Sequence, residues 1–270
     1  MTDNAVDDLK CDILLFFATQ TEREQLERGA KELDLPFEEK ADARVGTYFS
    51  LGTIGPNRVR AVKTRMGPFF HQGSASQAIV LRAASSATSI IQVGMAFGID
   101  RNAQEHGDVL VSQWVFPYDY RIIDHAAGQG GEPDRYVIDY RETKRFLPKR
   151  SLLNLFERER GEGKHEFKIH FGGILSGGSR IFSQLYLREL LVAVTGGQGT
   201  GDYVGGEMEG VGLLAASEKS KPVWAIVKGI SDFADDQRHD EIQANRPEAC
   251  LNAVRFVLAA LQRAGHVPTE

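Results

Sequence analysis

Two acidic residues lie in segments where a carboxyl group can do chemistry instead of facing solvent. Glu209 follows the glycine-rich segment 205–208 at the expected start of a helix, and Asp232 closely follows an apolar strand expected over residues 223–228. Ligands of open α/β sheets bind beyond the carboxyl ends of the strands. Two carboxyl groups at such an edge can protonate a leaving group and hold hydroxyl groups.

The elements that must position these residues alternate along the chain, which predicts an α/β domain with a largely parallel sheet covered by helices. Strands are expected over residues 12–17, 59–63, 89–93, 108–113, 170–175 and 223–228. Helices are expected over residues 21–35, 72–87, 184–194, 209–219 and 247–263, the last with Pro247 in its first turn. A turn is expected at 94–98, and loops at 126–148 and 195–206.

The 270 residues allow one large domain or two small ones, and because no linker is evident we expect a single domain over residues 1–270, with a twisted, mixed sheet flanked by helices. The chain is 42% hydrophobic, and its net charge of −5 argues against a general nucleic-acid surface. Cys11 and Cys250 lie far apart, which fits a reducing cytoplasm and suggests neither a disulfide nor a metal site. No apolar run is long enough for a membrane span, and the polar N-terminus lacks the core of a signal peptide. We therefore expect a cytoplasmic protein without metal or organic cofactor.

Four short motifs follow one another in a specific order: residues 93–98 (VGMAFG), 107–112 (GDVLVS), 207–209 (EME) and 229–232 (GISD). In this order they resemble the nucleoside phosphorylase superfamily, and most closely its methylthioadenosine/S-adenosylhomocysteine nucleosidase branch, over nearly the whole chain. The resemblance implies an αβα sandwich that hydrolyses the N-glycosidic bond of a purine nucleoside or nucleotide, releasing adenine. It also implies a homo-oligomer, either a dimer or a hexamer.

The same resemblance implies roles for five residues. Asp232 would be the general acid that protonates N7 of the departing purine, and Glu22 the general base that activates water. Glu209 would accept hydrogen bonds from the ribose 2′- and 3′-hydroxyls. Met208 would pack beneath the ribose, and Glu207 belongs to the same substrate-binding segment.

Each of these carboxyl groups also has a purely structural interpretation. Asp232 could be a turn residue after a strand, and Glu209 a first-turn glutamate that complements a helix dipole. Glu22 could belong to a solvated helix face, because its neighbours Arg23, Glu24, Glu27 and Arg28 are also charged.

The segment 94–98 is expected to bring backbone close to the purine, with Gly94 and Met95 as binding residues. Phe97 stands where the family pattern has a glycine, which changes the local shape.

The segment 176–181 resembles the loop that reads the edge of the base, with backbone near Ile181 contacting adenine. Arg180 occupies the position of a stacking aromatic residue. Either its guanidinium plane stacks on the ring, or the neighbouring Phe182 replaces it.

Hydrolysis and phosphorolysis are the main alternatives. Phosphorylases of this superfamily carry an arginine and a serine where this chain has Gln92 and Met95, so water is favoured as the nucleophile. A non-catalytic nucleotide-binding module on the same fold is a third possibility.

The 5′ side of the sugar site is expected to be more polar than a methylthio group requires. Its expected residues are Thr19, Arg65, Met66 and Ile242. Arg121, Arg180, Lys228 and His71 are further cations that could contribute positive charge to this side. A 5′-phosphorylated substrate such as AMP or ATP is therefore an alternative to methylthioadenosine and S-adenosylhomocysteine. Hydrolysis of AMP or ATP would fit a defence effector that depletes nucleotides.

Overall fold

The fold centres on a nine-stranded mixed sheet with strand order β10-β9-β6-β11-β5-β1-β4-β3-β2. The computed structural model describes residues 8–127, 134–140, 143–197, 200–217, 221–235 and 237–264. The strands of this sheet are β1 (Ile13–Phe17), β2 (Glu38–Asp42), β3 (Gly46–Ile54), β4 (Asn57–Lys63), β5 (Ser89–Gly98), β6 (Val109–Pro117), β9 (Ile169–Ser176), β10 (Tyr203–Glu207) and β11 (Trp224–Asp232). Because β10 also pairs with β5, the strands β5, β11, β6, β9 and β10 close on themselves.

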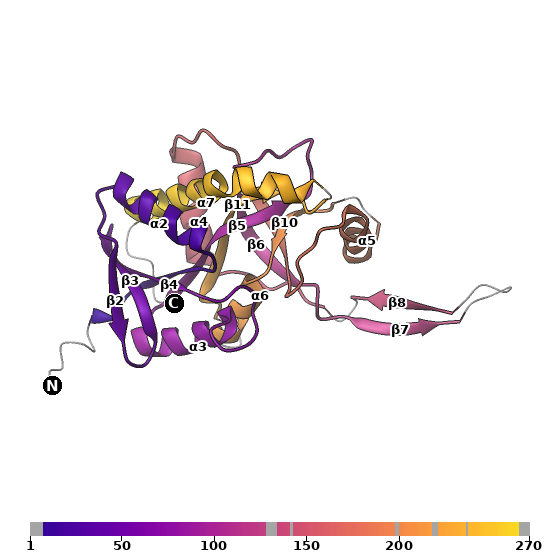
Figure 1. Cartoon of the computed structure of the whole chain (residues 1–270), viewed down its shortest axis with the longest axis horizontal. Coiled ribbons are helices and arrows are strands. Elements are labelled where there is room, and N and C mark those ends of the chain that lie inside the picture. The colour runs from indigo at the N-terminus through magenta and orange to yellow at the C-terminus, as the bar shows by residue number, and fades with distance from the viewer. Residues whose placement is uncertain are drawn as a thin grey trace.

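Helices cover both faces of the sheet (Figure 1). One face carries α2 (Gln20–Glu32), α4 (Arg150–Glu162) and α7 (Arg238–Arg263). The other carries α3 (Ser74–Ser85), α6 (Gly210–Leu213) and the short 3₁₀ helix η1 (Leu214–Ala216). Beside the β10 end lie α5 (Gln184–Thr195) and a projecting hairpin of β7 (Ile122–Ala126) and β8 (Arg135–Asp139). The predicted α/β architecture, a mixed sheet flanked by helices, is confirmed.

The central strands are apolar on both faces because helices bury both. All five residues of β1 and all nine of β11 are buried, as is typical of parallel strands in a covered sheet. Leu26 of α2 joins Val254 and Leu258 of α7 in the core on one face. Ala78 and Leu81 of α3 belong to the core on the other face. None of the helices in the described part is long and apolar enough to cross a membrane.

The end of β5 corrects one prediction. Residues 94–98 do not form a turn but continue the strand, because the end of β5 pairs antiparallel with β10. The predicted loop 195–206 accordingly runs into a strand, with residues 198 and 199 outside the described part.

The predicted loop 126–148 contains the strand β8, which pairs with β7, while residues 128–133 and 141–142 lie outside the described residues. The sequence patterns also missed α4, β2 and β3. β2 is an exposed edge strand of sequence EEKAD. Charged edge strands lack the apolar alternation by which a strand is predicted.

The bounds of two predicted helices were wrong. The helix expected over 209–219 is only the four-residue α6 followed by η1, and residues 218–220 lie outside the described part. The last helix begins at Arg238, and Pro247 lies inside it. A proline within a helix costs roughly 3 kcal/mol, but α7 buries a long apolar face between Ala249 and Leu261 that offsets this cost.

Candidate active site

A cavity of about 370 Å³ opens where β1, β5 and β11 end. Its wall includes three carboxyl groups from distant parts of the chain: Glu22, Glu209 and Asp232. All three side chains are buried, with residue exposures of 3%, 5% and 1%. Buried acidic residues are uncommon unless they are paired or functional, so this edge of the sheet is the candidate active site, as the positions of Glu209 and Asp232 predicted.

Glu22 is fixed by the residues that follow β1 and by residues of β5 and β11. It is the third residue of α2, where it forms a capping box with Thr19. Its Oε2 accepts hydrogen bonds from the backbone N–H groups of Ala18 (2.7 Å) and Thr19 (2.8 Å). Its Oε1 accepts one from Met95 N (3.0 Å) and lies 3.6 Å from Lys228 Nζ. The carboxylate therefore has one defined orientation between β1, β5 and β11.

Gly94 makes room for this carboxylate. Its φ is +147°, and a Cβ built there would lie 1.7 Å from Glu22 Oε1. No side chain fits that space, so the position requires glycine. Gly94 itself is not among the residues that line the cavity, whereas Met95 is.

Glu209 occupies the N-cap position of α6. Its Oε1 accepts a hydrogen bond from Gly67 N (3.2 Å), and its Oε2 accepts one from Lys228 Nζ (3.3 Å). Glu207 also lines the cavity, but its carboxylate accepts from the N–H groups of Glu209 (2.9 Å) and Gly210 (2.8 Å). The predicted binding residue Glu207 thus holds the turn that presents Glu209.

Lys228 links the two carboxylates. It lies in the middle of β11 with no exposed surface, within 3.6 Å of Glu22 Oε1 and 3.3 Å of Glu209 Oε2. Burial alone lowers the pKa of a lysine, but here the carboxylates of Glu22 and Glu209 outweigh burial and raise the pKa of Lys228. Burial raises the pKa of Glu209 to about 7, against the opposing effect of Lys228. The ammonium group therefore stays charged while Glu209 titrates near neutral pH.

Asp232 is the last residue of β11, where the sequence pattern expected it just beyond the strand. Its Oδ2 accepts a hydrogen bond from Ser231 Oγ (2.8 Å), and its Oδ1 accepts one from Ala234 N (3.0 Å). Ser231 Oγ also lies 3.2 Å from the carbonyl oxygen of Ala96 on β5. These contacts orient the carboxyl group at the wall of the cavity.

Of the other residues predicted to surround the base and ribose, all but Gly94 and Arg65 line the cavity. Met208, Met95, Ile181 and Arg180 all line it. Arg65 is exposed and lies outside the lining, so its predicted place beside the sugar is not supported by the geometry.

The unexpected Phe97 is accommodated by a glycine on the neighbouring strand. Phe97 lines the cavity, and a Cβ at Gly206 would lie 2.2 Å from its ring. Phe182, proposed above as a stacking residue, also lines the cavity and is half exposed.

The first turns of α7 contribute residues that the sequence patterns missed. His239, Ile242 and Arg246 line the cavity, and only Ile242 had been assigned to it. Their spacing of three and four residues places them on one helix face. The prediction that this helix begins at Pro247 concealed that pattern.

Three of the four further cations considered for the 5′ side, His71, Arg121 and Lys228, are not among the residues that line the cavity. Arg121 Nη1 instead donates to the hydroxyl group of Tyr186, and Lys228 Nζ lies between the carboxylates of Glu22 and Glu209.

One family motif has a structural role away from the cavity. Asp108, in the 107–112 motif, accepts hydrogen bonds from Lys168 N and contacts His170 Nε2 at 2.8 Å, which ties β6 to the start of β9. Among the described residues no group of three or more His, Cys, Asp or Glu is placed to hold a metal ion.

Comparison with known proteins agrees with this arrangement. Residues 12–262 match the family model described as the phosphorylase superfamily, and the chain belongs to that superfamily. The resemblance seen in the four motifs is confirmed at the level of the superfamily.

Solved structures show the same fold at low sequence identity. The 5′-methylthioadenosine/S-adenosylhomocysteine nucleosidase from S. pneumoniae, solved with the transition-state inhibitor MT-ImmA, has a TM-score of 0.70 and 19% identity, covering 93% of this chain and 98% of that chain. The futalosine hydrolase of Helicobacter pylori strain 26695 has a TM-score of 0.70 and 17% identity, covering 93% and 97%.

One curated relative is similar in sequence over part of its length. The "Death domain-containing ATP nucleosidase" of Amphimedon queenslandica is 27% identical over 186 residues, which are 63% of this chain and 32% of that protein. The present chain therefore spans about a third of the length of this relative.

Proposed function

We propose that this protein hydrolyses the N-glycosidic bond of a purine nucleoside or nucleotide and releases the base, adenine. The observation that carries the proposal is the convergence of Glu22, Glu209 and Asp232, with Lys228 between two of them, on one cavity. The nucleosidases with the same fold and the ATP nucleosidase with similar sequence support it.

In the proposed mechanism the bond between C1′ and N9 breaks while Asp232 donates a proton to N7 of the base. The sugar then carries positive charge, as in other glycoside hydrolyses. Glu209 accepts hydrogen bonds from the ribose hydroxyls, and its negative charge favours the cationic sugar. Glu22 takes a proton from the water whose oxygen bonds to C1′.

We further propose that the preferred substrate carries 5′-phosphate groups. His239 and Arg246 add cationic or protonatable groups to the α7 side of the cavity. No described carboxylate forms an ion pair with Arg246. Arginine is well suited to bind phosphate because its guanidinium group donates paired hydrogen bonds. Met66 and Ile242 supply some apolar surface, so methylthioadenosine is the competing substrate to be tested.

The decisive experiment is chromatographic detection of free base. The protein is incubated in phosphate-free buffer with methylthioadenosine, S-adenosylhomocysteine, adenosine, inosine, AMP or ATP. Release in this buffer, fastest with AMP or ATP, is expected. Release only after phosphate is added means that the enzyme is a phosphorylase. Absence of base release under both conditions contradicts the proposal and favours a non-catalytic binding module.

A homo-oligomer is also proposed. Phe69, Phe70 and Phe182 expose 58%, 86% and 49% of their surface, and Phe182 lines the cavity itself. Large exposed aromatic residues of this kind often mark an interface. Sedimentation of the purified protein tests the prediction, and a monomer at micromolar concentration contradicts it.

A further inference from the structure

A second cavity, of about 560 Å³, lies at the opposite edge of the sheet. Its wall includes Thr88 and Val223, which directly precede β5 and β11. The candidate active site lies where the same two strands end. At about 3.3 Å per residue, the ten residues of β5 separate the two cavities by roughly 30 Å.

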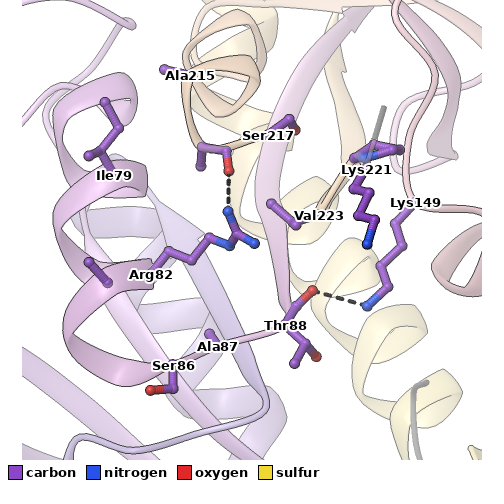
Figure 2. A pocket seen from close by; sticks show the side chains of 13 residues that line it. Ile79, Arg82, Ser86, Ala87, Thr88, Lys149, Ala215, Ser217, Lys221 and Val223 are labelled. Carbon is purple, nitrogen blue, oxygen red and sulfur yellow. Dashed lines mark hydrogen bonds between the residues drawn. The ribbon is translucent and has the colours of Figure 1, made fainter. Parts of the chain in front are cut away.

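Three cationic side chains surround this second cavity. Figure 2 shows Arg82 reaching toward it from α3, and Lys149 and Lys221 approaching from the other side. None of the described lining residues is acidic.

Lys149 is the most informative member of the cluster. Only 4% of its surface is exposed. Its Nζ donates to two neutral acceptors, Thr88 O (3.0 Å) and Ser89 Oγ (3.2 Å), and it forms no ion pair with any described residue. Burial and the nearby charge of Arg82 lower the pKa of Lys149. A buried ammonium group without a carboxylate partner is costly, and a bound anion would remove that cost.

Neutral hydrogen-bonding groups complete the wall. Ser217 lines the cavity, and its buried Oγ has no hydrogen-bond partner among the described residues. A buried hydroxyl group normally has a partner. Arg82 Nη1 donates to the carbonyl oxygen of Ala216 (2.7 Å), which holds the guanidinium group against η1. The cations are therefore positioned by the fold and do not extend freely into solvent.

We propose that this cavity is a second ligand site, which binds a small phosphorylated anion through Arg82, Lys149 and Lys221. Arginine and lysine are the side chains that proteins use for phosphate. The volume lies within the range of small-molecule sites. The site is separate from the candidate active site, and the inference does not depend on the reaction proposed there.

The test is isothermal titration calorimetry with inorganic triphosphate, comparing wild-type protein with single variants. Lys221→Gln removes an exposed charge without disturbing the core, and Lys149→Met removes the buried one. Each is expected to weaken binding on the order of tenfold or more, since each deletes a charge-assisted hydrogen bond. Lys164→Gln, on an exposed residue outside both cavities, is the matched control and should bind as wild type.

Arg246→Gln distinguishes the two cavities, because triphosphate bound at the candidate active site would be lost in that variant. Retained binding in Arg246→Gln, together with weakened binding in Lys221→Gln, supports the second site. Equal binding in Lys221→Gln and wild type, or loss confined to Arg246→Gln, overturns it. If Lys149→Met does not fold by circular dichroism, Lys221→Gln alone decides.

Discussion

Replacing Gly94 by alanine should disable the candidate active site through a single methyl group. The new Cβ would lie 1.7 Å from Glu22 Oε1 and 2.4 Å from its carboxyl carbon. Because contacts under 3.0 Å are essentially never observed for a Cβ, Glu22 must move. Oε1 would then lose its hydrogen bond from Met95 N and its position beside Lys228.

The cost of this substitution has two parts. A side chain at positive φ costs about 1–2 kcal/mol, and a lost hydrogen bond to a charged group costs about 1.5–3 kcal/mol. We therefore expect the free energy of unfolding to fall by about 3–5 kcal/mol. For a protein of this size that lowers the melting temperature by on the order of 10 °C. Base release should fall at least about 100-fold, because the proposed general base is displaced.

The assay combines thermal unfolding with chromatographic base release. Gly46→Ala is the matched control, since Gly46 also has a positive φ (+78°) but no atom within 4 Å of a built Cβ. Gly46→Ala should lose only the stability that a side chain at positive φ costs, and it should keep full activity. The double variant Glu22→Ala/Gly94→Ala removes the clashing carboxylate, so the two substitutions should be less destabilising together than their sum. Activity of Gly94→Ala within a few-fold of wild type, or strictly additive stabilities, would refute the reasoning.

Three other predictions concern single side chains of the cavity. Asp232→Asn should slow base release by about 10²–10⁴-fold with little change in melting temperature. The exposed control Asp240→Asn should keep full activity. Near-normal turnover of Asp232→Asn would contradict the role of Asp232 as the general acid. Because burial raises the pKa of Glu209 to about 7, the KM for adenosine should rise as pH falls below 7. Because the pKa of Glu209 is raised, the free energy of unfolding of the wild type should fall relative to that of Glu209→Gln as pH rises from about 4.5 to 7. A KM or a stability difference that does not change with pH contradicts the raised pKa of Glu209. Arg246→Gln should lower kcat/KM for ATP by roughly tenfold or more and leave adenosine hydrolysis within about threefold, and equal losses for both substrates would place Arg246 away from the phosphates.

Local sequence patterns were sufficient to predict the α/β class of fold. They also placed the carboxyl groups of Glu209 and Asp232, but not that of Glu22, at the carboxyl edge of the sheet. The apolar runs that became β1 and β11 are buried on both faces, so they are apolar throughout and are recognised without knowledge of their neighbours. Asp232 ends one such run, and Glu209 stands at the start of the helix that leads into it. Because a helix that leads into a parallel strand begins at the edge where the parallel strands end, the order of the elements predicts both residues at that edge.

Tertiary structure decided how those groups are held. The register of β11 against β5 pairs Lys228 with Gly94, which places the ammonium group beside the carboxylate that Gly94 admits. The pairing of β10 with β5 extends a strand where local glycines predicted a turn. The apolar face of α7 carries the helix through Pro247 and brings Arg246 to the cavity. Each outcome depends on contacts between residues far apart in the chain, and their energy outweighs the local preferences from which a sequence is read.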